Sequence, residues 1–188
     1  MRLLRFRTTA AALTAVVLAA LTAGCGTAET TESTGSTGSK TSEAGAGSTA
    51  AKVPTQLRFS AKTVDGKAFE GSSLAGKDAV LWFWAPWCTV CRGEAPTVAK
   101  VAEKWSDKVT FVGVPGRGET ADMKQFISDT GLDGMPHAVD ADGSLWAGFG
   151  VPAQPAVAFV NDDGKVKVGL GPVTSAQFDA ELERLTQQ

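Results

Sequence analysis

Apolar and polar positions divide the chain into three stretches of different character. Residues 10–21 form an apolar run, and residues 26–52 contain no aromatic and no large aliphatic side chain. From Val53 onward, short apolar runs alternate with stretches of helix-like patterning. This alternation is typical of an α/β sheet with helices packed on its faces. We therefore expect residues 53–188 to fold as one compact domain.

The apolar runs predict the strands of that sheet. Residues 79–85, "AVLWFWA", are apolar throughout and lie between Gly76 and Pro86, which favours a buried strand. The remaining strands are predicted at residues 57–69, as a hairpin turning at Asp65-Gly66, at residues 108–116, as the next central strand, and at residues 156–161 and 166–170, joined by a turn.

Helix-like stretches follow several of the strands. The longest helix should begin near Cys88, be disturbed at Pro96 because proline has no N–H to donate, and run to about Trp105. A second helix, residues 119–131, should be closed by its final glycine. A short helical piece at residues 144–150 and a final helix at residues 175–187 complete the domain.

The N-terminus has the pattern of a secretory signal. Three arginines, Arg2, Arg5 and Arg7, precede the apolar run, and small residues follow it before Cys25. The run is shorter than the roughly 20 residues of a bilayer-spanning helix, which favours a signal peptide at residues 1–24 over a permanent anchor. We expect the chain to be exported.

Cys25 ends a segment, "LTAGC", that resembles the lipobox of bacterial lipoproteins, although Thr22 stands where leucine is usual. The resemblance implies cleavage before Cys25 and acylation of its thiol, which would hold the protein at the outer face of the cytoplasmic membrane. An ordinary cleavage site followed by a free cysteine is the alternative. Residues 25–52 would then form a disordered tether with a root-mean-square reach of roughly 30 Å.

Charge excludes some classes of partner. The chain carries 18 Lys and Arg against 20 Asp and Glu, and loss of the three signal arginines would leave 15 against 20. No Lys/Arg cluster remains, which argues against nucleic acid or an electrostatic membrane surface as partner. We expect no cofactor.

Two cysteines, Cys88 and Cys91, are separated by two residues in "WAPWCTVC". A strand that delivers Cys88 to a helix N-terminus sets its sulfur near unpaired N–H groups and the positive end of the helix dipole. Both favour thiolate, which is the nucleophilic form. We expect Cys88 to attack and Cys91, about one turn further on and turned inward, to resolve. Acylation of Cys25 would remove the odd thiol and leave this pair.

A structural bond and a metal site are the alternatives for the pair. The short loop between the cysteines gives a disulfide comparatively little chain-entropy stabilisation, which disfavours a purely structural bond. A closed zinc site needs four ligands, whereas the chain offers one pair and one histidine, His137. We expect no metal, and we interpret His137 as a structural residue in a loop that leads into a strand.

A strand leading directly into C-x-x-C at a helix start resembles the thioredoxin fold, over essentially all of the domain. The segments "GKDAVLWFWAPWCTVCRGEAP", "DADGSLWAGFGV" and "QPAVAFVNDDGKV" are similar to the extracytoplasmic TlpA/DsbE-type thiol-disulfide oxidoreductases. The similarity is greatest to the secreted and lipid-anchored DsbE/DsbF-like proteins of actinobacteria. It implies a central mixed sheet flanked by helices, with an N-terminal β-hairpin extension.

The resemblance also implies a substrate-binding loop. Pro155 would be a cis-proline facing the cysteine pair, with Pro152 as the competing position. Gln154 precedes it, where the backbone offers hydrogen bonds to an extended substrate segment. Trp87, with Trp84 and Pro86, would shape an apolar rim around the sulfurs.

Proton handling is implied at two further positions. Glu94 fits the glutamate that TlpA-like proteins carry three residues after the second cysteine, and it would exchange a proton with Cys91. A solvated glutamate on the first turn of the helix is the alternative. Trp82 stands where cytoplasmic thioredoxins carry a buried acid.

These features predict a membrane-tethered thiol-disulfide oxidoreductase that forms disulfides in exported proteins bearing cysteines. A membrane redox partner would recycle the cysteine pair. The residues between the cysteines, Thr89 and Val90, do not decide the direction of electron flow. A TlpA-like reductase for cytochrome c maturation is the main alternative, and a copper- or peptide-binding lipoprotein without turnover is another.

Overall fold

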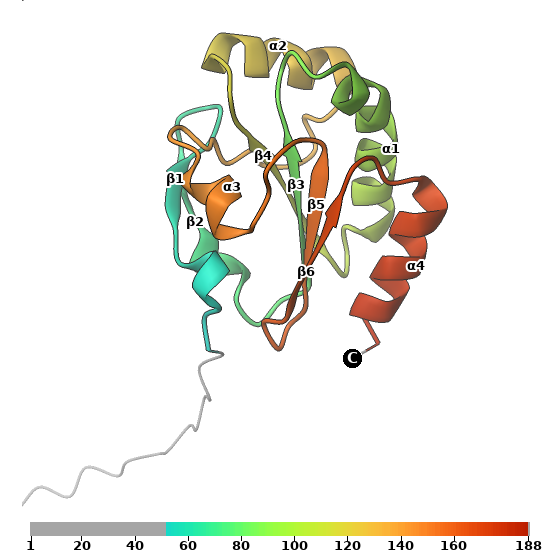
Figure 1. Ribbon diagram of the computed structural model, residues 1–188. Helices are drawn as coiled ribbons and strands as arrows, with labels where there is room; N and C mark the ends of the chain where they lie inside the picture. The colour runs from blue at the N-terminus through green and yellow to red at the C-terminus, as the bar shows by residue number, and fades with distance from the viewer. Residues whose placement is uncertain (1–51, 188) are drawn as a thin grey trace, which may run out of the picture. The chain divides into compact units, whose positions relative to one another are not determined.

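The computed structural model describes residues 52–187, and Figure 1 shows its helices and strands. The signal predicted at residues 1–24, the acylated Cys25 and the tether before Lys52 lie outside the described residues. The elements, in chain order, are η1 (Thr55–Leu57), β1 (Ser60–Lys62), β2 (Ala68–Glu70), η2 (Gly71–Leu74), β3 (Ala79–Trp84), α1 (Thr89–Trp105), β4 (Thr110–Pro115), α2 (Thr120–Thr130), α3 (Ser144–Gly148), β5 (Ala156–Val160), β6 (Val166–Leu170) and α4 (Ser175–Leu185).

Four strands form the main sheet in the order β4-β3-β5-β6. β3 pairs parallel to β4 and antiparallel to β5, and β5 pairs antiparallel to β6. The sheet is therefore mixed, and helices cover it on both sides (Figure 1). This is a thioredoxin-like fold, as the sequence predicted.

β3 separates the core into two clusters because successive side chains of a strand point to opposite faces. One face of β3 packs with apolar residues of α1, α2 and α4, and its side chains are Val80, Trp82 and Trp84. The other face packs with α3 and η1, and its side chains are Ala79, Leu81 and Phe83. Burial on both faces explains why the strand is apolar throughout.

The predicted N-terminal hairpin is confirmed as a separate two-stranded antiparallel sheet of β1 and β2. Gly66 takes φ +83° in its turn, a conformation that glycine adopts without a Cβ penalty. A single bridge between Thr63 and Ala138 joins the hairpin to the segment that follows α2.

Two details differ from the sequence prediction. β4 is an edge strand of the four-stranded sheet rather than a central one, and its outer side is covered by bridges from Gly113 to His137 and from Gly116 to Asp140. These bridges pair some of the main-chain groups on the outer edge of β4 and keep the strand buried. Its sequence is therefore as apolar as that of a central strand.

The second difference concerns α1, which runs without a break through Pro96. Proline there removes the one hydrogen bond that it would donate to the carbonyl of Arg92. The buried residues Ala95 and Val98 on either side pack in the core and hold the helix in register.

Within residues 52–187, no helix combines the length and apolar character needed to cross a bilayer.

Candidate active site

Cys88 and Cys91 form a disulfide at the N-terminus of α1, with an S–S distance of 2.10 Å and a Cα–Cα distance of 5.2 Å. β3 ends at Trp84, and the turn that follows is closed by a main-chain hydrogen bond of 3.1 Å from Cys88 N to Ala85 O. Cys88 is the N-cap of α1, and its Sγ accepts the N–H of Cys91 at 3.0 Å. The predicted helix start at Cys88 is therefore confirmed.

The two sulfurs differ in their surroundings. The Cys88 residue is 6% exposed, whereas Cys91 is fully buried in the core. Two large apolar side chains, Trp87 and Val90, are exposed beside them, at 60% and 51%. Of the two sulfur-bearing residues, Cys88 is therefore the one nearer to solvent, and exposed apolar side chains border it.

The strand neighbour of β3 brings the predicted proline loop to the same end of the sheet. The Gln154-Pro155 peptide bond is cis, and among residues 52–187 it is the one cis bond, so the competing position at Pro152 is excluded. In the ladder Phe83 pairs with Ala156, which puts Pro155 next to the end of β3. The prediction of a cis bond at Pro155 is confirmed.

Glu94 is buried beneath this end of the fold, and the alternative of a solvated carboxylate is wrong. Its two oxygens accept hydrogen bonds from Trp82 Nε1 at 3.0 Å and from Val173 N at 2.5 Å. Burial raises the pKa of the Glu94 carboxyl above its ordinary value, and the bonds from Val173 and Trp82 act in the opposite direction. A buried carboxyl with a raised pKa keeps its proton to a higher pH than a solvated glutamate does.

Of the three residues expected to form an apolar rim, only two lie at the surface. Trp84 is fully buried, stacks on Phe126 at 4.3 Å between ring centroids and meets the edge of His137 at 5.7 Å. Trp87 is exposed and Pro86 is half-buried. Trp84 is thus a core residue that supports the site from below.

His137 lies in the core behind Trp84. It is 4% exposed, and its Nε2 lies 3.0 Å from the carbonyl oxygen of Leu132. Burial lowers the pKa of the His137 imidazole. Among residues 52–187, no group of three or more His, Cys, Asp or Glu side chains is arranged to hold a metal ion.

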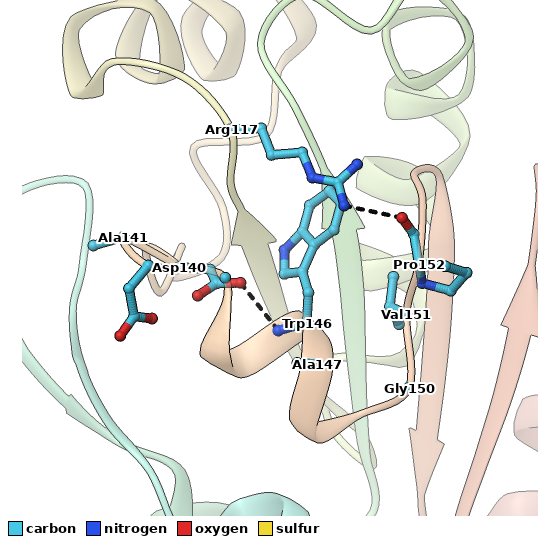
Figure 2. Close-up of a pocket in the computed structure, with 10 residues that line it drawn as sticks. Arg117, Asp140, Ala141, Trp146, Ala147, Gly150, Val151 and Pro152 are labelled. Carbon is cyan, nitrogen blue, oxygen red and sulfur yellow. Dashed lines mark hydrogen bonds between the residues drawn. The ribbon is translucent and has the colours of Figure 1, made fainter. Parts of the chain in front are cut away.

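Sequence reasoning missed a set of residues that borders the cysteine loop, with Arg117 at its centre. The carbonyl oxygen of Arg117 accepts a hydrogen bond of 2.6 Å from Trp87 Nε1. Its guanidinium lies over the ring of Trp146, 4.6 Å from the centroid, and donates to Pro152 O at 2.9 Å. Figure 2 shows this side chain at the wall of a pocket of about 720 Å³ that also includes Asp140.

The available signal for Arg117 is the pattern Gly-Arg-Gly directly after a buried strand. A Cβ at Gly116 would lie 3.1 Å from the ring of Trp146, and one at Gly118 would lie 2.4 Å from Pro86 Cγ. Both glycines therefore permit close approach of the chain to an aromatic ring or to the cysteine loop. Asp140 fixes the backbone that carries the Trp146 ring, because its carboxylate accepts hydrogen bonds from the main-chain N–H groups of Leu145 and Trp146.

A thioredoxin-like fold that carries a C-x-x-C disulfide at a helix N-cap and a cis-proline at the same end of the sheet defines a class of thiol-disulfide exchange proteins. Residues 46–182 match the Redoxin family, and the chain belongs to that family.

The similar proteins agree with this class. The chain is 44% identical over 133 residues to the soluble secreted antigen MPT53 of Mycobacterium tuberculosis, covering 71% of this chain and 75% of that protein. A structure of MTB DsbF in mixed oxidised and reduced forms matches with a TM-score of 0.70 and 48% identity, over 72% of this chain and all of that one. A secreted Mycobacterium tuberculosis disulfide oxidoreductase homologous to Escherichia coli DsbE matches with a TM-score of 0.63 and 40% identity, over 71% and 98% of the two chains. The protein is a thiol-disulfide oxidoreductase of the DsbE and DsbF type, with its cysteine pair at residues 88 and 91.

Proposed function

We propose that this protein forms disulfides in exported proteins, with Cys88 as the attacked and attacking cysteine and Cys91 as the resolving one. The observation that carries the proposal is the difference between the two sulfurs. Cys88 caps α1, accepts the N–H of Cys91 and lies beside the exposed Trp87, whereas Cys91 is fully buried.

The exchange requires only the cysteine pair and the substrate thiols. A thiolate of the substrate attacks Cys88 Sγ, the Cys88–Cys91 bond breaks, and Cys91 leaves with the bonding electron pair. A second substrate thiolate then attacks the substrate sulfur of the mixed disulfide, and Cys88 leaves as thiolate. Two electrons pass from the substrate to the pair, and a membrane redox partner accepts them when it restores the disulfide.

Glu94 serves as the proton holder for Cys91. Both lie on the first turns of α1, and burial raises the pKa of the Glu94 carboxyl, so this group keeps its proton to a higher pH than an ordinary glutamate and, when protonated, donates it to the sulfur that leaves. Trp87, Gln154 and Pro155 form the surface that receives an extended segment of the substrate around its cysteine. These roles rest on burial, hydrogen bonding and the position of the proline loop.

Electron flow from the substrate to the protein is favoured by two features. The N-cap position of Cys88 stabilises a thiolate, and thiolate stabilisation makes a disulfide more oxidising. Trp82 occupies the strand position at which an acid would oppose that thiolate. Glu94 favours the second candidate, a reductase for cytochrome c maturation, because a buried acid near the pair disfavours thiolate when it is ionised.

Export is supported by the two relatives that are described as secreted. We propose further that Cys25 is acylated and holds the domain at the outer face of the cytoplasmic membrane through residues 26–52, after removal of residues 1–24. The substrates are then exported proteins that bear cysteines.

A paired assay tests the direction. Refolding of reduced ribonuclease by the oxidised protein is expected to exceed the background rate, while reduction of insulin by the protein with dithiothreitol is expected to be slow by comparison. The opposite ranking would overturn the oxidase and favour the reductase. Stoichiometric copper on the reduced protein, with neither reaction catalysed, would favour the lipoprotein without turnover.

A further inference from the structure

Arg117 adopts a conformation that is unusual for its residue type. Its φ is +56°, and among residues 52–187 it is the one non-glycine residue with a positive φ. A side chain in the left-handed region is uncommon and persists where surrounding contacts hold it. Arg117 is exposed, so core packing does not account for the conformation.

Three segments around the cysteines meet at this residue. Its main chain accepts Trp87 Nε1 at 2.6 Å, which ties it to the residue before Cys88. Its guanidinium donates to Pro152 O at 2.9 Å and lies within 3.4 Å of Gln154 Oε1. Figure 2 shows the guanidinium extended over the Trp146 ring toward the chain at Pro152.

The contact with Gln154 fixes which end of its amide faces outward. A guanidinium has five N–H donors and no acceptor, so it can be paired only with the oxygen of a glutamine amide. With Oε1 directed at Arg117, the two N–H groups on Nε2 point to the other side of the amide. Gln154 is half-buried and directly precedes Pro155, so these donors lie at the edge of the proline loop.

We propose that Arg117 is a positioning residue for substrate polypeptide: it orients the Gln154 amide so that Nε2 donates to a main-chain carbonyl of the extended segment that carries the substrate cysteine. The inference rests on the proposed exchange with protein substrates, and it adds a specificity contact that a small dithiol cannot make. Because Arg117 also holds Trp87, it fixes the relative placement of both walls of the substrate surface.

The test compares two reductants of the oxidised full-length protein: an unstructured, uncharged dithiol peptide and dithiothreitol, which has no peptide carbonyl. Arg117→Gln is expected to raise KM for the peptide about fivefold, the effect of losing about one hydrogen bond, and to leave the dithiothreitol rate within twofold. Arg117→Lys keeps the charge but cannot bond both acceptors as a fork, so its KM for the peptide should lie between those of the wild type and Arg117→Gln. Arg58→Gln is the matched control, since Arg58 also donates to a main-chain carbonyl, that of Val53 at 3.3 Å, and should leave both rates unchanged.

A second variant removes the Nε2 donors themselves. Gln154→Glu keeps an acceptor for Arg117 and removes the outward donors, so it should raise the peptide KM as much as Arg117→Gln, and the double variant should be no worse than either. Equal losses with peptide and dithiothreitol, or an unchanged peptide KM in folded Arg117→Gln or Arg117→Lys, would overturn the inference alone. A wild type inactive toward both dithiols would overturn the proposed function and the inference together.

Discussion

Trp82 Nε1 donates a 3.0 Å hydrogen bond to Glu94 Oε2, and both side chains are buried. Trp82 comes from the central strand and Glu94 from the helix that carries the cysteines. Cytoplasmic thioredoxins carry a buried acid at this strand position. Here the position is occupied by Trp82, and its indole binds an acid that the helix supplies. The buried carboxyl of this protein reaches the site from α1 rather than from β3.

The raised pKa of Glu94 predicts a pH-dependent contribution to stability. The folded protein binds a proton at Glu94 more tightly than the unfolded chain, whose ordinary value is 4.5, so unfolding free energy falls as pH rises through the interval above that value. Relative to Glu94→Gln, the oxidised wild type should gain stability on acidification from pH 8 to about 4.5. Urea unfolding across this range measures it, and Glu103→Gln, exposed on the same helix, is the control that should run parallel to the wild type. Parallel curves for Glu94→Gln would contradict the prediction.

Removal of the Trp82 indole donor should also change stability in a pH-dependent way, because the indole is hydrogen-bonded to Glu94. Trp82→Phe leaves the Glu94 carboxyl with the N–H of Val173 as its remaining described partner, and at pH values where that carboxyl is ionised it should lower the unfolding free energy by about 1–3 kcal/mol beyond the loss from the smaller ring. The loss from the smaller ring is independent of pH, whereas the hydrogen-bond loss should shrink as Glu94 becomes protonated. A destabilisation that is constant from pH 4 to 8 would mean that the bond contributes nothing.

The unequal burial of the two sulfurs predicts their roles in trapping experiments. Cys91→Ala should accumulate mixed disulfides through Cys88, while Cys88→Ala should be inactive and trap little. On the reduced wild type, iodoacetamide should modify Cys88 about tenfold faster than Cys91, because Cys88 is the accessible sulfur at the helix terminus. Peptide mapping by mass spectrometry gives both readouts. Faster labelling of Cys91, or trapping through it, would reverse the assignment.

The anchor is tested by one substitution. If Cys25 is acylated as proposed, Cys25→Ala should move the protein from the membrane fraction to the soluble fraction without changing the exchange chemistry of Cys88 and Cys91, because Cys25 is not one of the two cysteines of the disulfide. Fractionation with mass spectrometry of the wild type checks it. A wild type that is soluble and carries no lipid would show that the lipoprotein assignment is wrong.

The strands and the redox pair could be predicted because their signals are local. A short apolar run such as residues 79–84, followed by Pro86, is typical of a buried strand, and Cys88 comes four residues after it at a helix start. The cis bond at Pro155 was implied by resemblance and by the apolar run that begins after it. Each of these depends on residues that are neighbours in sequence.

The contacts that the sequence did not reveal join residues far apart in the chain. Glu94 looks like a surface residue of a first turn until Val173, 79 positions away, and Trp82 provide its donors. The guanidinium of Arg117 likewise donates a hydrogen bond to the carbonyl of Pro152, 35 positions away. Such pairings depend on how loops cross the end of the sheet, and hydrophobic periodicity carries no information about them.

The reduction potential tests the direction of electron flow most directly. The potential depends on how much the fold stabilises the reduced pair, chiefly as thiolate, relative to the disulfide. The helix N-cap at Cys88 stabilises that thiolate, and the indole of Trp82 adds no negative charge beneath it. We expect a potential above that of thioredoxin, which lies at about −270 mV, and a further rise in Glu94→Gln at pH values where Glu94 is ionised, since the amide carries no charge to oppose the thiolate. A glutathione or dithiothreitol redox titration followed by tryptophan fluorescence measures both potentials, because Trp84 and Trp87 lie within four residues of Cys88 in the sequence.

Glu103→Gln serves again as the matched control, and its potential should equal that of the wild type. A wild-type potential at or below that of thioredoxin would rule out the oxidase and leave the cytochrome-maturation reductase as the function to pursue.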